Sequence, residues 1–444
     1  MPSYRNDAGN GEQIGTPSLW SWFRLIVLLI SAIGFFNIYS STFYMNLENG
    51  VNPYNHVFWH GVYFIAGLVV CYGAYKMPLA LFRARVCIWI YVLLTFLILV
   101  SVFFFGRTVN GATRWIYIGF SIQPSEIAKV TAILWAAASL ADRLKRGEPV
   151  SFFLAFWEWL SSRFNGEIKG MAKKSFRSML GVYTPLLVPL LFAGLVMGQP
   201  DMGTAALILG FPVLLYMFCG VPVLEIIVML IISVFLFFGF AMSASYRWER
   251  VWVLWDPFSH ATDQGYQTVQ SLIAVGSGGI FGQGAGQGLA KFLYLPEQHT
   301  DFAFAVLSQE GGFLVASIVI LLYSGLLAVG FLMAKRITRL FPALLVYGLT
   351  MLIGMEGFLN IAMVLGSFPV TGVPLPFISF GGSSLVMNLL SVGLIGNAVH
   401  YGEAMRSKEE RAKKLEILAP YPQSLRKISG AVFRPPEDDR FKNY

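Results

Sequence analysis

The sequence predicts an all-α membrane protein that crosses a bilayer about ten times, with one large outer loop between its seventh and eighth spans. Of the 444 residues, 56% are hydrophobic and only 13% are charged. An ordinary soluble domain carries about a quarter charged residues. The apolar residues come in runs of about 20, the length of a helix that spans the hydrocarbon core. No run alternates as barrel strands do. These observations exclude a soluble enzyme, a disulfide scaffold, a coiled coil and a disordered chain.

The apolar runs set the boundaries of the predicted spans. In order, they are 20–44, 56–76, 86–105, 124–141, 182–198, 203–219, 223–244, 311–334, 342–362 and 383–401. The first run is too long for a signal peptide and lacks a convincing cleavage site, so we expect an uncleaved span. Residues 1–18 then form an N-terminal tail, 19–401 the membrane domain, and 402–444 a C-terminal tail that starts as a charged helix.

The distribution of Lys and Arg predicts the orientation. With the N-terminus inside, 26 of the 32 basic residues fall on the inner side, 5 fall outside, and Lys129 lies within a span. This asymmetry predicts cytoplasmic termini, and it explains the net charge of +8 without a nucleic-acid partner. The inner loop 142–181 contains FFLAFWEWL followed by basic residues, a pattern typical of an interfacial helix.

The outer loop 245–310 collects charge that the rest of the chain avoids, and Asp301 lies near its end. One interpretation makes Thr300 or Asp301 the N-cap of the following helix. The other makes Asp301 a general base at the water–lipid boundary, where partial desolvation strengthens a carboxylate as a base. The two interpretations are compatible.

Charged and Pro/Gly-rich motifs mark further candidate positions. Pro124 predicts a helix start, and Glu126 and Lys129, three residues apart, can pair on one helix face, either at a functional cavity or as a structural ion pair. Asp201 is expected to cap a helix. The Gly-rich run 276–286 lacks the lysine and serine of a phosphate loop, so we expect a tight turn where backbones approach closely.

Several long segments together resemble the SEDS family (shape, elongation, division and sporulation), which contains FtsW, RodA and SpoVE. They are NGATRWIYIG, QPSEIAK, QPDMGTA, YQTVQSLIAVGSGGIFGQG, YLPEQHTDFAFAV and PLPFISFGGSSL. YLPEQHTDF and YQTVQSLIAVGSGG look more like FtsW, whereas PVTGVPLPF leans toward RodA. The resemblance implies a ten-helix peptidoglycan glycosyltransferase in the bacterial cytoplasmic membrane that uses lipid II at its outer face.

The resemblance also implies roles for individual residues. Asp301 corresponds to the catalytic aspartate and would deprotonate the acceptor sugar hydroxyl, with inversion at the donor carbon and release of undecaprenyl diphosphate. The residues expected to contact substrate are Arg114, Trp115, Glu126, Lys129, Arg247, Arg250, Lys291, His299 and Ser383. Among them, Arg114 and Lys129 are the first candidates for stabilising the diphosphate.

The cofactor and partner expectations are limited. The histidines and cysteines show no zinc-ligand spacing, and no resident metal is expected, although a Mg²⁺ or Mn²⁺ ion at the diphosphate fits the chemistry. The family implies a class B penicillin-binding transpeptidase and other division or elongation proteins as partners. Two alternatives stay open, a lipid II flippase and a scaffold for the transpeptidase.

Overall fold

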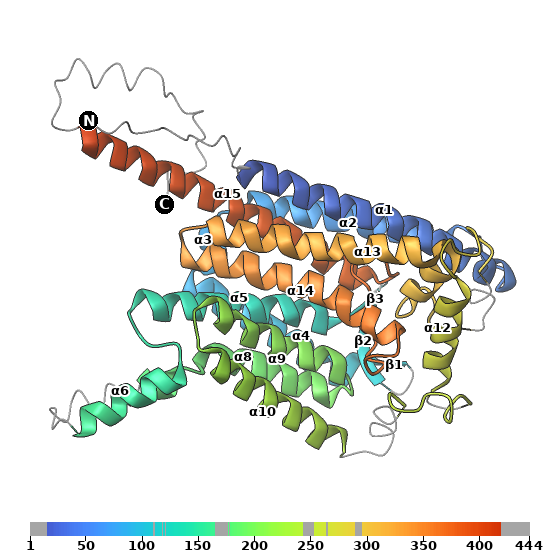
Figure 1. The fold of residues 1–444 in the computed structure, drawn as a ribbon, viewed down its shortest axis with the longest axis horizontal. Coiled ribbons are helices and arrows are strands. Elements are labelled where there is room, and N and C mark those ends of the chain that lie inside the picture. Colours follow the sequence, from blue (N-terminus) through green and yellow to red (C-terminus); the bar gives the residue numbers. More distant parts are fainter. Residues whose placement is uncertain are drawn as a thin grey trace, which may run out of the picture.

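The computed structural model describes residues 16–109, 112–117, 119, 121–164, 176, 178–242, 253–262, 265–288 and 295–418. These residues form a bundle of long helices lying side by side (Figure 1). The long helices are α1 (Thr16–Glu48), α2 (Asn55–Lys76), α4 (Arg85–Phe105), α5 (Pro124–Lys145), α8 (Thr184–Gly198), α9 (Met202–Phe218), α10 (Val223–Ala241), α13 (Ala303–Arg336), α14 (Leu340–Val364) and α15 (Gly382–Leu418). Three other helices are α3 (Leu79–Arg83), α6 (Phe152–Phe164) and α12 (Tyr266–Ser277).

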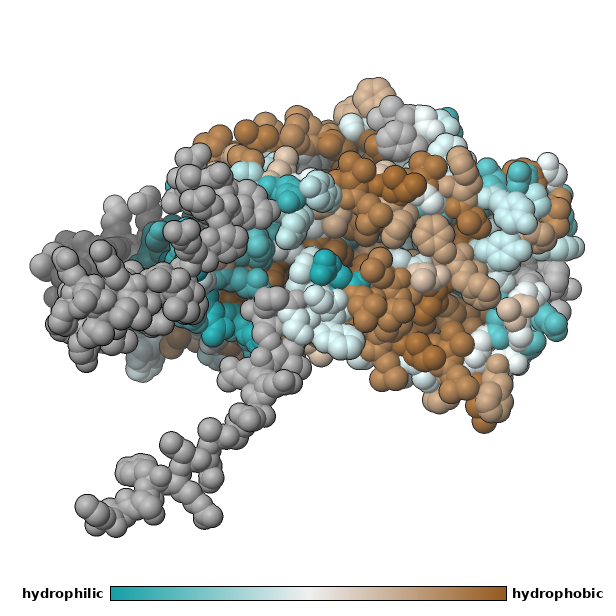
Figure 2. Space-filling view, turned by 90° about the horizontal axis from the view of Figure 1, so that it is seen from above, coloured by the Kyte–Doolittle hydropathy of each residue, from teal (hydrophilic) through white to brown (hydrophobic). Residues whose placement is uncertain are grey.

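Six helices in the described ranges are long and apolar enough to cross a membrane, namely α1, α2, α4, α13, α14 and α15. The shorter apolar helices α8, α9 and α10 and the more polar α5 run beside them, so the count of ten spans stays a prediction. Apolar side chains cover the middle of the face in Figure 2, and hydrophilic ones gather toward its two ends. This banding is the surface expected of a protein surrounded by lipid.

The helices α14 and α15 lie at the centre of the bundle. In their most apolar stretches, 78% and 72% of the residues are buried, against 17% to 33% in the other four long helices. Small residues bring the backbones together. A Cβ on Gly393 of α15 would lie 2.3 Å from the carbonyl oxygen of Cys71 on α2, so only glycine fits there.

One end of the bundle carries a small sheet, which the all-α prediction missed. The strands are β1 (Arg107–Val109), β2 (Ala112–Tyr117) and β3 (Ser121–Ile122), joined antiparallel in that order. The sequence between 106 and 123 is too short and polar to span the membrane, so its backbone groups pair locally instead. We call this end the sheet end, and the opposite end, which carries α3, the basic end (Figure 1).

The eighth predicted span begins earlier than expected. We expected it at 311–334 after an outer loop ending at 310, whereas α13 begins at Ala303. Gly312 interrupts the helix with a φ of 65° and a ψ of −167°, so the first turns of α13 meet the rest of the helix at a kink. The N-cap prediction was wrong, because Phe302 occupies the cap position and the hydroxyl of Thr300 donates to Glu297 instead.

Other local predictions are confirmed. Pro124 occupies the first turn of α5, and the Asp201 carboxylate accepts the backbone N–H of Thr204 at the start of α9. The Gly-rich turn approaches α13 so closely that a Cβ on Gly282 would lie 2.0 Å from the carbonyl oxygen of Glu310. The aromatic stretch of the inner loop forms α6, and α15 continues through the charged segment after residue 402.

Replacing Gly393 with Ala tests the α2–α15 contact. The added methyl group has to push the Cys71 backbone away, and overpacking of this kind costs about 1–3 kcal/mol. We expect Gly393→Ala to lower the thermal unfolding temperature of the detergent-solubilised protein. Gly73→Ala on α2 is the matched control, because a Cβ there meets nothing within 4 Å. Equal unfolding temperatures for the two variants would contradict this packing.

Candidate functional site

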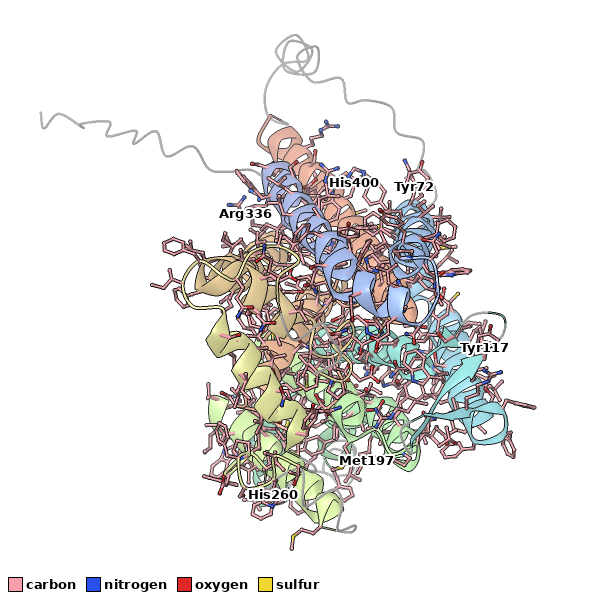
Figure 3. All side chains as sticks on the ribbon, turned by 90° about the vertical axis from the view of Figure 1, so that its right-hand side faces the viewer. Tyr72, Tyr117, Met197, His260, Arg336 and His400 are labelled. Atoms are coloured by element: carbon pink, nitrogen blue, oxygen red, sulfur yellow. The ribbon has the colours of Figure 1, made fainter. Side chains whose placement is uncertain are left out.

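A groove of about 720 Å³ opens at the sheet end. Its walls come from the sheet, from α12, from the loop before α13 and from the segment between α14 and α15. Figure 3 views the molecule from this end, with Tyr117 of β2 among the labelled side chains. The residues that line it are Arg107, Arg114, Trp115, Tyr117, Ser121, Gln123, Gln267, Pro296, Glu297, His299, Thr300, Asp301, Val370, Thr371, Gly372, Phe380, Gly381 and Gly382.

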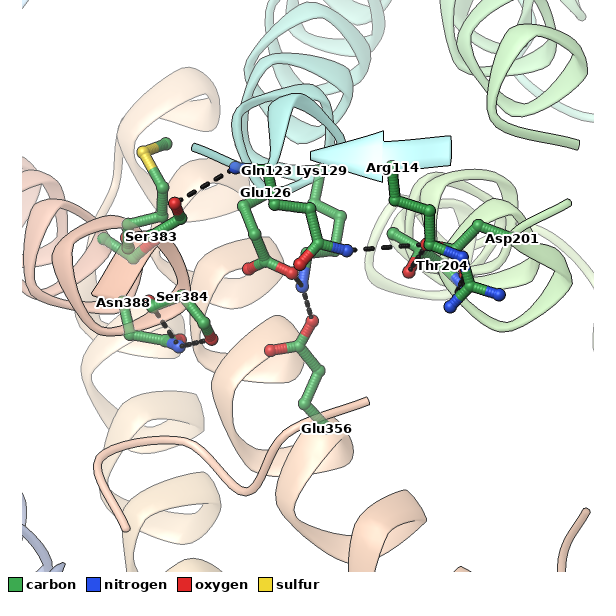
Figure 4. Close-up of polar contacts among 12 residues, drawn as sticks. Arg114, Gln123, Glu126, Lys129, Asp201, Thr204, Glu356, Ser383, Ser384 and Asn388 are labelled. Carbon is green, nitrogen blue, oxygen red and sulfur yellow. Dashed lines mark hydrogen bonds and ion pairs between the residues drawn. The ribbon is translucent and has the colours of Figure 1, made fainter. Parts of the chain in front are cut away.

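Arg114 points from β2 toward the start of α9. Its Nη2 donates to the carbonyl oxygen of Pro200 at 2.7 Å, and its Nη1 lies 3.8 Å from Oδ1 of Asp201. The Asp201 carboxylate is buried and also accepts from the Thr204 hydroxyl at 3.0 Å (Figure 4). The guanidinium is therefore fixed in direction while its side chain keeps 23% exposure to the groove.

Asp301 lies in a loop whose backbone is held by side chains of the bundle. Asn360 of α14 donates from Nδ2 to the carbonyl oxygens of Asp301 at 2.7 Å and Val373 at 2.8 Å. The backbone N–H of Phe380 donates to the carbonyl oxygen of His299 at 2.8 Å. These bonds satisfy backbone groups that no helix or strand pairs, and they fix where the Asp301 carboxylate lies.

The Asp301 carboxylate and the Arg114 guanidinium both lie beside Gly372. A Cβ built on this residue would lie 3.4 Å from Nη1 of Arg114 and 3.5 Å from Oδ2 of Asp301. Both groups thus reach the same point on the groove wall, and Gly372, with a φ of 71°, leaves that point open. The groove therefore presents a carboxylate and a fixed cation to one bound molecule.

Glu126 and Lys129 lie buried behind this wall and do not line the groove. They pair as predicted, with 2.8 Å between Lys129 Nζ and Glu126 Oε1, and Nζ also donates to Oε1 of Glu356 on α14 (Figure 4). We call Glu126, Lys129 and Glu356 the ion triad. All three side chains are at most 3% exposed, so the triad joins α5 to α14 inside the bundle.

Ser383 is not among the groove-lining residues, but it hydrogen-bonds two residues that are, Ser121 and Gln123. Its Oγ accepts from the backbone N–H of Gln123 at 3.1 Å and donates to the carbonyl oxygen of Ser121 at 3.1 Å. Trp115 lines the groove directly. Arg247, Arg250 and Lys291 lie outside the described residues.

The comparisons with known proteins identify the family of this chain. A family model described as a cell cycle protein, FtsW/RodA/SpoVE, matches residues 21–404. The chain belongs to the FtsW/RodA/SpoVE family. It is 32% identical over 384 residues to a probable peptidoglycan glycosyltransferase FtsW of Coxiella burnetii, covering 85% of this chain and 95% of that one. It is 35% identical over 307 residues to stage V sporulation protein E of Bacillus subtilis, covering 69% and 76%.

Solved structures share the fold of this family member. RodA of Thermus thermophilus superposes with a TM-score of 0.57 at 25% identity, covering 85% of this chain and 95% of that one. A chain from a peptidoglycan synthase complex that coordinates polymerization and crosslinking gives 0.65 at 25% identity, covering 85% and 96%. The helical membrane fold implied by the resemblance is therefore confirmed.

Sequence reasoning missed two residues that organise the site in this FtsW/RodA/SpoVE protein. Glu356 is a lone acid inside the apolar run 342–362, and a charge at that depth calls for a partner. That signal was available. Asn360 gave no comparable signal, because its two acceptors are backbone carbonyls that only the folded loops bring together.

The groove of this family member has carboxylates that fit a metal ion arriving with the substrate. Within the ranges that the structure describes, no group of three or more His, Cys, Asp or Glu side chains is placed to hold a metal ion. The groove does offer two carboxylates, Glu297 and Asp301. Magnesium is often held by one or two carboxylates together with substrate phosphates, so these residues fit an ion that arrives with a diphosphate.

Replacing Lys129 with Met tests the ion triad. This change leaves two buried carboxylates without their cation, and breaking a buried pair in this way costs about 3–5 kcal/mol. We expect Lys129→Met to lower the unfolding temperature strongly. The triple variant Glu126→Gln, Lys129→Met, Glu356→Gln removes all three charges and should regain most of the loss. A single variant as stable as the unmodified protein would contradict the triad.

The stability of the groove should depend on the protonation of His299. Burial, followed by the nearby His56 ring at 5.3 Å between ring centroids, lowers the pKa of His299 to about 4, and Glu297 opposes this shift. The unfolded chain therefore binds more protons than the folded one between pH 6.5 and pH 4, and stability falls as the pH drops through that window.

We expect His299→Gln to flatten the fall of the unfolding temperature between pH 6.5 and pH 4. His260→Gln, outside the groove, is the control. Parallel pH profiles for the unmodified protein and His299→Gln would show that this imidazole does not titrate as described.

Proposed function

We propose that this chain is a peptidoglycan glycosyltransferase that polymerises lipid II at the outer face of the bacterial cytoplasmic membrane. The similar protein of Coxiella burnetii, a probable peptidoglycan glycosyltransferase, supports the reaction class. The observation that carries the proposal is the shared groove position of the Asp301 carboxylate and the Arg114 guanidinium beside Gly372. That pair provides a base for an incoming hydroxyl and a cation for a departing phosphate.

Asp301 acts as the general base. It removes the proton from the 4-hydroxyl of the acceptor N-acetylglucosamine as that oxygen attacks C1 of the donor N-acetylmuramic acid. The new glycosidic bond forms as the bond from C1 to the diphosphate breaks, and the electron pair leaves with undecaprenyl diphosphate. Attack opposite the leaving group inverts the donor carbon. Diphosphate leaves readily, so this site needs no second carboxylic acid of the kind used in glycoside hydrolysis.

Arg114 stabilises the negative charge that develops on the departing diphosphate. Its guanidinium is already oriented by Pro200 and Asp201, so little reorganisation accompanies the reaction. Arg107 also lines the groove, with its guanidinium carbon 4.5 Å from the centre of the Tyr117 ring. A Mg²⁺ or Mn²⁺ ion, where one accompanies the diphosphate, would be held by Asp301 and Glu297 and would add positive charge there.

The proposed orientation places the sheet end outside and both termini in the cytoplasm. The excess of Lys and Arg on the inner loops supports it. A class B penicillin-binding transpeptidase is the proposed partner, because one similar chain belongs to a peptidoglycan synthase complex that couples polymerization to crosslinking. Other membrane proteins of the division or elongation machinery complete the proposed assembly.

The variant Asp301→Asn tests the proposed base. It keeps the size and the hydrogen-bonding shape of the side chain but cannot accept the proton. We expect glycan synthesis from lipid II by the purified protein, with its transpeptidase, to fall at least about 100-fold. Lipid II binding and the unfolding temperature should stay close to those of the unmodified protein.

Asp256→Asn is the control, because Asp256 is a carboxylate that caps an exposed turn through Ser259 and does not line the groove. Near-normal polymer from Asp301→Asn would remove Asp301 from its role. Redistribution of lipid II across vesicles without polymer would indicate a flippase. No activity of either kind in the unmodified protein with its transpeptidase would indicate a scaffold.

A further inference from the structure

A second cavity, of about 310 Å³, lies at the basic end of the bundle. It is formed where α3, the start of α4, the end of α5 and the start of α8 meet. Figure 1 shows α3 at the opposite end from the sheet, so this cavity is separate from the proposed active site. We call it the arginine pocket, and its lining residues are Arg83, Arg85, Ile88, Trp89, Trp135, Ala138, Ser139, Asp142, Arg143, Arg146 and Thr184.

The arginine pocket carries an excess of positive charge. Four arginines line it, against one lining carboxylate, Asp142, and Glu148 nearby. Asp142 lies 3.9 Å from Arg83 Nη2 and 3.7 Å from Arg85 Nη2, and its side chain is 40% exposed. Pairs so long and so exposed contribute little, so Arg83 and Arg85 stay available to an anion. Arg146 is instead held by Glu148 at 2.7 and 3.1 Å.

Two residues that line this pocket carry buried N–H groups with no acceptor among the described residues. They are Nε1 of Trp135 and Nε of Arg143, on residues that are 9% and 4% exposed. The other nitrogens of Arg143 are used. Nη2 donates to the carbonyl oxygens of Pro149 at 2.7 Å and Ser178 at 3.0 Å, and Nη1 lies 3.3 Å from Glu148.

Buried donors without an acceptor are rare and costly, about 1–3 kcal/mol each. A water molecule would relieve one donor but would not use the charge around it. An oxyanion with several oxygens satisfies both donors and the surrounding guanidinium groups at once. The chemistry of the pocket thus matches a phosphate.

The position of the pocket identifies the source of that phosphate. Trp89 packs edge-on against Trp135, with 4.8 Å between ring centroids, and is itself 52% exposed on the apolar surface of α4. Tryptophans at the ends of spanning helices lie at the depth of lipid head groups. Basic pockets between spanning helices on the cytoplasmic side are typical binding sites for anionic lipid head groups.

We propose that the arginine pocket binds the phosphate of an anionic phospholipid from the leaflet at the basic end. The phosphate oxygens accept from Trp135 Nε1 and Arg143 Nε, and Arg83 and Arg85 hold the head group from the open side. The lipid then connects α4 and α5 to the inner loop that Arg143 anchors. This assignment is independent of the reaction at the sheet end.

Native mass spectrometry of the full-length protein in detergent, stripped of lipid, tests the proposal. The probes are phosphatidylglycerol, phosphatidylcholine with the same acyl chains, and inorganic phosphate. We expect one phosphatidylglycerol to bind at least about tenfold more tightly than phosphatidylcholine, because the ammonium group of choline brings a positive charge close to Arg83 and Arg85. Millimolar inorganic phosphate should not displace it.

Two variants remove the proposed contacts. Trp135→Phe keeps the ring but removes its N–H, and we expect phosphatidylglycerol binding to weaken about tenfold. Arg83→Gln with Arg85→Gln should abolish the preference for phosphatidylglycerol. The controls are Trp59→Phe on α2 and Arg406→Gln on α15, where Arg406 pairs with Glu410 at 2.8 Å outside the pocket. Arg85→Gln alone, at a side chain that is 76% exposed, serves if the double variant does not fold.

Three outcomes would overturn the proposal. Equal binding of the two lipids removes the anionic selectivity. Unchanged binding in Trp135→Phe and in the arginine variants would show that the lipid binds elsewhere on the protein. Inorganic phosphate that occupies the pocket and displaces phosphatidylglycerol assigns the site to a soluble phosphate rather than to a lipid.

Discussion

An ammonium group held between two carboxylates, inside the bundle and away from water, is the interaction on which the site at the sheet end depends. Lys129 and Glu126 belong to α5, and Glu356 belongs to α14. Each helix carries a site-organising residue within about one turn of the triad. Gln123, the N-cap of α5, contacts Ser383, and Asn360 of α14 holds the Asp301 loop. The triad thus fixes the two walls of the groove relative to each other.

The same constraint explains why irregular backbone is tolerated here. Unpaired peptide groups are excluded from lipid but are accepted where they line a cavity and find partners. A helix side chain supplies some of these partners, as when Asn360 of α14 donates to the carbonyl oxygens of Asp301 and Val373. The loops supply others themselves, as when Ser379 Oγ donates to the carbonyl oxygen of Thr300 and accepts the backbone N–H of Leu375 at 2.9 Å. These bonds hold the backbone that carries the Asp301 carboxylate.

The long apolar runs predicted the helices well, because the length and hydropathy of a run are local properties and the hydrocarbon core requires both of a spanning helix. The Asp201 cap and the Glu126–Lys129 pair were predictable for the same reason, since each joins residues at most three positions apart. The small sheet, the kink at Gly312 and the third member of the triad were not predicted. Each depends on contacts between distant segments, such as Lys129 with Glu356, or on a backbone shape that several residues share.

The structure distinguishes Lys129 from Arg114, the two cations that the sequence suggested for stabilising the diphosphate. Lys129 is enclosed by two carboxylates and excluded from the groove, so its charge is already neutralised and cannot respond to a departing phosphate. Arg114 faces the groove beside the Asp301 carboxylate, and its ion-pair partner Asp201 lies 3.8 Å away and also accepts from Thr204. A charge that is oriented but incompletely neutralised stabilises a developing anion best. The ion triad is accordingly the buried support of the groove wall, and Arg114 is the residue that we propose to act on the departing diphosphate.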